Sequence, residues 1–203
     1  MPRSTKANAV RNRQRLFEEA RRQFAARGFH ATSIGNIAAA VGLTKQSLLH
    51  HFGSKENLFS EVLEDLAANM ADRVLAIESQ DLDPADRLEA FLLDTLLGDT
   101  NEQMQIVIRE LLENSERASG ARQWHLIDYL SSLVSMVQAV PGNRDLTDSE
   151  AFARLYFLLG AVSYFKISQP TLQGMLGNEQ KDKVQLAFAA ELHQFIHNNV
   201  IHT

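Results

Sequence analysis

Four consecutive polar residues, from Thr44 to Ser47, carry the side chains of this sequence that are best suited to recognising a ligand. Thr44 and Ser47 offer hydroxyls, Lys45 offers a cation and Gln46 offers a carboxamide. A glutamine can form two hydrogen bonds to one adenine, a lysine can reach guanine acceptors or phosphate, and a hydroxyl is a versatile partner. These residue types at the start of one short helix predict contacts to base edges in a DNA groove.

Two short helical segments must position Thr44 to Ser47, which we call the polar tip. Ser33 is a typical cap for a helix over residues 34–41, Gly42 turns the chain, and Thr44 caps a second helix that ends near residue 51. Helix, glycine-containing turn and capped helix together form a helix-turn-helix arrangement, in which the second helix enters the major groove. Taken alone, two such helices also fit an ordinary helical hairpin.

Residues that bind the DNA phosphates are expected outside the polar tip. The helix starts capped by Ser33 and Ser54 offer free amides and positive dipole ends, and Lys55 lies beside the second of them. Leu48 and Phe52 are one helical turn apart, so we expect both to point inward and hold the recognition helix in its domain.

The charge distribution favours a nucleic-acid partner. Residues 1–55 contain ten Lys or Arg and two Glu, which gives them a formal charge of +8. Because the whole chain has a formal net charge of −5, residues 56–203 carry −13. The arginine run alone also fits an ordinary solvated helix surface. Combined with the helix-turn-helix pattern, a basic segment on an acidic body is typical of a DNA-binding module.

The segment from Phe24 to Leu58 resembles the N-terminal DNA-binding domain of the TetR (tetracycline-repressor-like) family of bacterial transcriptional regulators. The residues that carry the resemblance are Phe24, Arg27-Gly28-Phe29, Ala31-Thr32-Ser33-Ile34, Ile37-Ala38, Val41-Gly42-Leu43-Thr44-Lys45, Leu48, His50, Phe52 and Ser54-Lys55-Glu56. About the first 60 residues match closely, and the rest matches only as a string of helices. The resemblance implies a homodimer that binds a palindromic operator and usually releases it when a small molecule enters the C-terminal domain.

The sequence departs from the family pattern within the recognition helix. Gln46 stands where the family often has Gly or Ala, and Leu49 and His51 stand where it has Tyr. The resemblance implies a phosphate contact for His51, with pH-dependent strength, and Leu49 could pack on a thymine methyl group. The predicted DNA-binding residues are Ser33, Thr44, Lys45, Gln46, Ser47, Leu49, His50, His51, Ser54 and Lys55.

The whole chain is predicted to be all-α, with no strand-type alternation. Stop and start signals predict helices over about residues 7–27, 34–41, 44–51, 55–79, 84–97, 100–119, 121–140, 151–168 and 178–199. We divide them into a DNA-binding domain, residues 1–55, and an effector-binding and dimerisation domain, residues 56–203. The helix over 151–168 is apolar nearly all round, so this subunit or a partner must enclose it. The last two helices are the predicted homodimer interface, where they would form a four-helix bundle with their symmetry mates.

Apolar residues of the C-terminal domain are first of all a core, and some must border a pocket if a small-molecule effector binds. The candidate pocket residues are Phe91, Met104, Ile108, Leu111, Trp124, Ile127, Tyr156, Tyr164 and Lys166. Lys166 lies on the enclosed helix, where it could snorkel to the surface, pair with a neighbour or meet an acidic ligand, in that order of preference.

Other chemistry finds little support in the sequence. The chain has no cysteine, so thiol catalysis and thiolate metal sites are excluded. No nucleophile elbow or phosphate-binding glycine loop frames its Ser, His and Asp residues, so we predict neither an enzyme nor a cofactor. His193 and His197 lie four residues apart on the last helix without an obvious carboxylate partner, which favours a solvated face over a metal site.

Alternatives remain at the level of function. One is a family member that binds DNA without a small-molecule inducer, as an architectural or replication-linked factor. Another is a helical interaction or enzymatic module with an incidental basic arm. The charged N-terminus and the lack of a long apolar run predict a cytoplasmic, nucleoid-associated protein without a membrane anchor.

Overall fold

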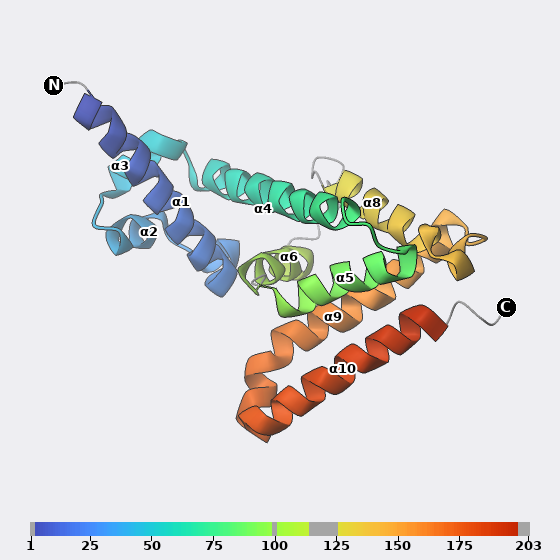
Figure 1. Cartoon of the computed structure of the whole chain (residues 1–203). Helices are drawn as coiled ribbons and strands as arrows, with labels where there is room; N and C mark the ends of the chain where they lie inside the picture. The colour runs from blue at the N-terminus through green and yellow to red at the C-terminus, as the bar shows by residue number, and fades with distance from the viewer. Residues whose placement is uncertain (1–2, 99–100, 114–125, 199–203) are drawn as a thin grey trace. The chain divides into compact units, whose positions relative to one another are not determined.

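The computed structural model describes residues 3–98, 101–113 and 126–198, and within these ranges the chain forms helices and no strand (Figure 1). The all-helical prediction is confirmed for this part of the chain. The chain divides into two compact units, Met1–Ala68 with Glu102–Trp124, and Asn69–Asn101 with His125–Thr203.

The described helices divide between the two units. The first unit contains α1 (Arg3–Ala31), α2 (Ile34–Ala40), α3 (Lys45–Phe52), the first half of α4 (Lys55–Glu78) and nearly all of α6 (Asn101–Glu113). The second unit contains the rest of α4, α5 (Pro84–Leu97), α8 (Leu126–Ala139), a 3-10 turn at Pro141–Asn143, α9 (Asp148–Leu176) and α10 (Asn178–Asn198).

The first unit is closed by a glycine stop in α1. Gly28 has φ 76° and ψ 172°, so the helix is interrupted there, as predicted. Phe29 then folds back, and its ring centroid lies 6.1 Å from that of Phe24 and 5.0 Å from that of Phe59 on α4. The buried Thr32 hydroxyl donates to the carbonyl of Gly28 at 2.7 Å, which ties the segment after the stop to the end of the helix.

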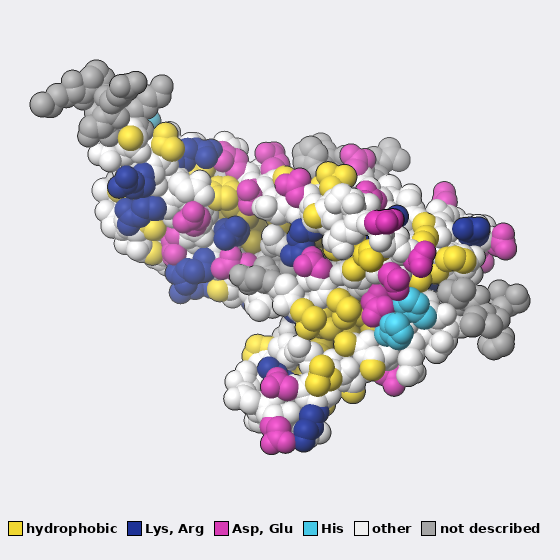
Figure 2. All heavy atoms as spheres, viewed as in Figure 1, with side chains coloured by type: hydrophobic (Ala, Val, Ile, Leu, Met, Phe, Trp, Pro, Cys, Tyr) yellow, Lys and Arg dark blue, Asp and Glu magenta, His cyan; other side chains and the backbone are white. Residues whose placement is uncertain are grey.

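Basic side chains gather on the first unit. Figure 2 shows Lys and Arg side chains over the part of the molecule where Figure 1 draws α1, α2 and α3. On this face, basic side chains therefore lie near the two short helices, as the sequence leads one to expect.

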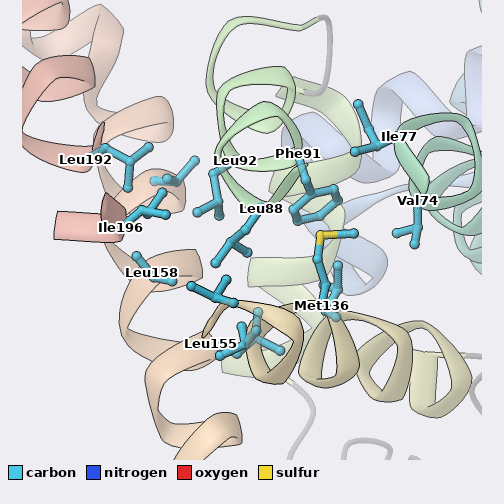
Figure 3. Packing of buried hydrophobic residues seen from close by; sticks show 14 of the residues in the cluster. Val74, Ile77, Leu88, Phe91, Leu92, Met136, Leu155, Leu158, Leu192 and Ile196 are labelled. Atoms are coloured by element: carbon cyan, nitrogen blue, oxygen red, sulfur yellow. The ribbon is translucent and has the colours of Figure 1, made fainter. Parts of the chain in front are cut away.

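The second unit has one apolar core, to which five helices contribute (Figure 3). Phe91 of α5 lies beside Met136 of α8, while Leu158 of α9 and Ile196 of α10 approach the other side of α5. Val74 and Ile77 bring the second half of α4 into the same core. This packing fixes α5, α8, α9 and α10 relative to one another.

Two predicted helix boundaries and one predicted side-chain cap are wrong. The first helix begins at Arg3 rather than near residue 7. α9 continues through Pro170 to Leu176 rather than ending at residue 168. A proline removes a single N–H from the helix, and Leu172 packs against the core beyond it, so packing overrides the local stop signal. Asp83 precedes α5 as predicted, but its side chain makes no capping hydrogen bond.

Other boundary predictions have mixed outcomes. The capping box at Thr147 and Glu150 is confirmed, since each side chain bonds to the backbone N–H of the other residue. The box expected at Thr100, and the helix end and start expected at residues 119 and 121, lie outside the described residues.

The Lys166 side chain is buried, so the expectation that it snorkels to the surface is wrong. It is 7% exposed, and its amino group donates to the carbonyl of Leu96 at 2.8 Å and to that of Gly98. These carbonyls lie at the C-terminal end of α5, where a helix has unsatisfied acceptors and a negative dipole end. Lys166 therefore ties α9 to the end of α5.

Replacing Lys166 with methionine should lower the free energy of unfolding by about 1–3 kcal/mol, because buried carbonyls lose their donor while the side-chain volume is kept. Urea unfolding followed by circular dichroism measures the change. Lys183→Met is the matched control, since Lys183 pairs with Glu179 on the exposed face of α10, and its effect should stay below about 0.5 kcal/mol. Equal losses in the two variants would contradict the assigned role of Lys166.

Candidate DNA-binding surface

The N-terminal end of α3 presents polar side chains to solvent. Thr44 caps the helix, and its hydroxyl accepts a hydrogen bond from the backbone N–H of Ser47 at 3.1 Å. Thr44, Lys45 and Gln46 are exposed and Ser47 is half-buried. Three of the four predicted base-contacting residues are thus accessible, while the Ser47 amide serves the cap.

The opposite side of α3 anchors it. Leu48 and Phe52 are buried, as their spacing predicted. The guanidinium of Arg13 lies 4.6 Å from the centroid of the Phe52 ring, so α1 covers this side. Because the inner face is packed, the polar tip of α3 keeps a fixed direction.

α2 and the turn hold α3 in place. Gly42 has φ +72°, a conformation that suits glycine, and Leu43 N–H donates to the carbonyl of Ala38 at 2.8 Å. Arg15 donates to the carbonyl of Val41 at 2.9 Å and so links α1 to the end of α2. Ile37 is buried and holds α2 in the domain.

The predicted phosphate anchors lie at helix starts. Ser33 caps α2, where its hydroxyl accepts from the N–H of Gly35 at 3.2 Å, and Ser54 accepts from the N–H of Asn57 at 3.1 Å at the start of α4. Lys55 is half-buried. Its ammonium lies 4.3 Å from the Phe29 ring centroid and 3.4 Å from the carbonyl oxygen of His30. Lys55 therefore also packs the domain, a contact that the sequence pattern does not indicate.

Several arginines of the basic segment are engaged within the first unit. Arg13 pairs with Glu61 of α4, Arg21 pairs with Glu102 of α6 at 3.1 Å, and Arg22 pairs with Glu19 at 2.6 Å. Arg22 is the main reason that the pKa of Glu19 lies below its usual value. Some arginines of the basic segment thus make contacts within the protein. Counting charged residues in the sequence does not distinguish these arginines from those that are free to contact DNA.

The two histidines of α3 differ in exposure. His50 is exposed, whereas His51 is half-buried. Burial, together with the nearby His50 and Arg13, lowers the pKa of His51 below its ordinary value. These surroundings therefore favour the neutral form of the His51 ring in the free protein. Leu49 is half-buried beside them.

The predicted pocket residues divide between the two units. Met104 and Ile108 lie half-buried on α6 in the first unit. In the second unit Phe91 and Lys166 are buried, while Tyr156 and Tyr164 are exposed on α9. The side chains of Leu111, Trp124 and Ile127 lie outside the described residues. The pocket lining stays a prediction.

The expectation that His193 and His197 lack a carboxylate partner is wrong. Both rings contact one oxygen of Glu89 on α5, His193 Nδ1 at 2.8 Å and His197 Nε2 at 2.9 Å. The sequence could not show this contact, since Glu89 lies more than 100 residues away along the chain.

No helix in the described part of the chain is long and apolar enough to cross a membrane.

Known proteins match both the sequence and the fold. Residues 16–62 match the family model of "Bacterial regulatory proteins, tetR family". The chain is 32% identical over 113 residues to the HTH-type transcriptional regulator AcrR of Shigella flexneri. This alignment covers 55% of this chain and 53% of AcrR. It is 28% identical over 124 residues to the HTH-type transcriptional repressor KstR2 of Mycolicibacterium smegmatis, covering 61% of this chain and 60% of KstR2.

The chain thus aligns with little more than half the length of these curated relatives. At the level of the fold, it matches AibR, solved in complex with isovaleryl coenzyme A and operator DNA, with a TM-score of 0.66 and 21% identity, over 91% of this chain and 97% of AibR. The matched segment contains the helix-turn-helix described above, and the relatives are transcriptional regulators rather than enzymes. Residues 16–62 therefore form a DNA-binding domain of the TetR family of bacterial regulatory proteins.

Proposed function

We propose that the chain is a ligand-responsive, dimeric transcriptional repressor that binds a palindromic operator. One observation carries the proposal: the exposed polar tip of α3, Thr44 to Gln46, is held rigidly by the buried Leu48 and Phe52 within the segment that matches the family. Residues 1–55 would contact DNA, and residues 56–203 would bind the effector and form the dimer. Such a protein works where the chromosome lies, in the bacterial cytoplasm and on the nucleoid.

The base contacts follow from the chemistry of this tip. Gln46 would bond an adenine through its carboxamide, and Lys45 would reach guanine acceptors or phosphate. Thr44 and Ser47 add hydroxyls, and Leu49 would pack on a thymine methyl group. Around them, Ser33, His50, His51, Ser54 and Lys55 would contact the phosphates. The strength of the His51 contact would depend on pH, because a phosphate favours the protonated ring whereas its surroundings in the free protein lower its pKa.

The exposed apolar surface of the second unit supports a dimer through α9 and α10. Of the eleven large apolar side chains exposed in the described residues, eight lie on these two helices. They are Phe152, Tyr156, Phe157, Tyr164, Ile167, Met175, Leu176 and Leu186. The other face of α9 packs in the core of its own subunit. A second copy of the chain would cover the outward face and complete a four-helix bundle.

Dimer geometry would connect effector and operator. Two recognition helices must lie about 34–36 Å apart to read two half-sites of one operator. An effector that binds more tightly to a dimer with another helix separation lowers operator affinity. The size of the effect is set by the difference between its affinities for that dimer and for the DNA-binding dimer. AibR, with the same fold, was solved with both a small molecule and operator DNA, which supports a small-molecule effector here. Its pocket would include some of the apolar residues predicted for this purpose.

The direct test is selection of binding sites by the purified chain from random duplex DNA. The expected result is a palindromic consensus with half-sites about one helical turn apart. The same protein should shift DNA from upstream of its own gene in a gel. Failure to enrich any sequence, together with failure to shift that DNA, would contradict the proposal.

Operator affinity should depend steeply on salt. With about four phosphate contacts per subunit, and so about eight per dimer, log affinity should fall with log salt concentration with a slope of about −7. Fluorescence anisotropy with labelled operator at several salt concentrations measures this slope. A flat dependence would show that phosphates do not anchor the protein.

The second candidate function is a DNA-binding family member without an inducer. A thermal-shift screen of small molecules distinguishes the two candidates, because any ligand that binds the folded state raises its Tm. Stabilisation by a compound that also releases the operator supports the ligand-responsive repressor. A screen without a stabilising compound favours the second candidate.

A further inference from the structure

α5 and α10 bring three potential metal ligands together on the surface of the second unit. Nδ1 of His193, Nε2 of His197 and a carboxylate oxygen of Glu89 lie within 4.8 Å of one another. His193 and His197 are one helical turn apart on α10, and their ring centroids are 4.3 Å apart. Figure 2 shows a group of histidine side chains next to acidic ones, over the part of the molecule where Figure 1 draws the C-terminal end of α10.

The site is half-enclosed. The Glu89 side chain is 17% exposed, that of His197 is 27% exposed, and that of His193 is 55% exposed. One side of the cluster therefore faces solvent, and an ion there could keep water in its remaining coordination positions. Asp86, one turn before Glu89 on α5, places Oδ1 3.5 Å from Nε2 of His197 and supplies a further carboxylate beside the group.

The core beneath the cluster holds its two helices in register. Leu192 and Ile196 of α10 are buried next to the two histidines in sequence, and Leu88 is buried next to Glu89. These residues belong to one apolar core (Figure 3). The backbone positions of the three residues are therefore set by packing.

The donor set selects a class of metal. Two imidazole nitrogens and one carboxylate oxygen suit Zn²⁺ and neighbouring divalent transition metals, and a His₂-carboxylate set with open positions is a known zinc arrangement. Mg²⁺ and Ca²⁺ prefer oxygen ligands only. The chain contains no cysteine to offer a competing thiolate site.

We propose that Glu89, His193 and His197 form a binding site for a divalent transition metal of the Zn²⁺ class, which links α10 to α5. The proposal concerns the second unit alone and does not depend on the proposed DNA-binding function. The competing explanation is a hydrogen-bonded cluster without a metal, in which both rings donate to Glu89.

The experiment is a calorimetric titration of the full, tag-free chain with Zn²⁺ after treatment with a chelator. We expect one tight site per chain with a micromolar or lower Kd. Glu89→Gln keeps the shape of the side chain but removes its charge, and should weaken Zn²⁺ binding by at least about tenfold. His193→Ala combined with His197→Ala should remove the site. His30→Ala, which removes an exposed histidine outside the cluster, should leave Zn²⁺ binding unchanged.

Thermal unfolding gives a second readout that does not require fitting a binding curve. At a Zn²⁺ concentration about 100 times the Kd, the Tm of the unaltered chain should rise by about 5 °C or more. Mg²⁺ at the same concentration should leave the Tm unchanged, and the double histidine variant should not respond to Zn²⁺. If the unaltered chain and the double variant bind Zn²⁺ equally, or if neither binds it, the cluster is a hydrogen-bonded contact only and the proposal is wrong.

Discussion

Replacing Phe157 and Tyr164 together by glutamate should convert the dimer to a monomer and lower operator affinity by about 100-fold or more. Both residues lie on α9, where Phe157 is 60% exposed and Tyr164 is 73% exposed in the single chain. Glutamates at these positions remain solvated in the monomer, but a twofold interface would bury four of them without partners. A monomer then binds one half-site and loses the gain that comes from binding two half-sites at once.

Light scattering at micromolar protein concentration measures the oligomeric state, and anisotropy with labelled operator measures affinity. Leu75→Glu is the matched control, because Leu75 is a similarly exposed apolar residue that lies on α4. It should leave both the dimer and the operator affinity unchanged. The proposed interface is wrong if the double variant remains dimeric, or if Leu75→Glu alone produces a monomer.

Much of the DNA-binding surface is predictable because its determinants are local in sequence. Ser33, Thr44 and Ser54 each cap a helix through a bond to an N–H two or three residues ahead. Gly28 and Gly53 adopt the positive φ that ends their helices. Each of these features depends on only a few neighbouring residues, so the sequence pattern contains the information needed to predict it.

Long-range contacts were not predictable in this way. Lys166 meets carbonyl groups about 70 residues earlier in the chain, and Arg109 of α6 donates to the carbonyls of Ala25 and Ala26 at the end of α1. Glu89 meets two histidines more than 100 residues away. A pattern of residue types does not show which helices become neighbours, so such partners emerge only from the packed structure.

The same limit applies to the arginines of the basic segment. Arg13, Arg15 and Arg21 contribute to the positive charge counted in the sequence, yet each also makes a contact within the first unit. Counting charges gives the net charge of the segment. It does not predict which cations remain available for phosphate, because that depends on the acceptors that folding brings near them.

Replacing Gln46 with alanine should weaken operator binding by about 1–3 kcal/mol and relax the base preference at one position of each half-site. Gln46 is exposed in the first turn of α3. The substitution therefore removes a base contact while the buried Leu48 continues to hold the helix. Sequence selection with the variant measures the change in preference, and anisotropy measures the change in affinity.

Lys55→Ala provides the contrast that separates reading a base from holding the backbone. A lysine that contacts phosphate contributes to every DNA sequence alike, so its loss should weaken binding uniformly and reduce the salt slope by about 1 per subunit. Because Lys55 also lies over the Phe29 ring, the Tm of this variant must be measured to confirm that the domain remains folded at the assay temperature. If Gln46→Ala retains the sequence preference of the unaltered chain and weakens all sequences equally, Gln46 does not read a base, and the recognition must come from other residues of α3.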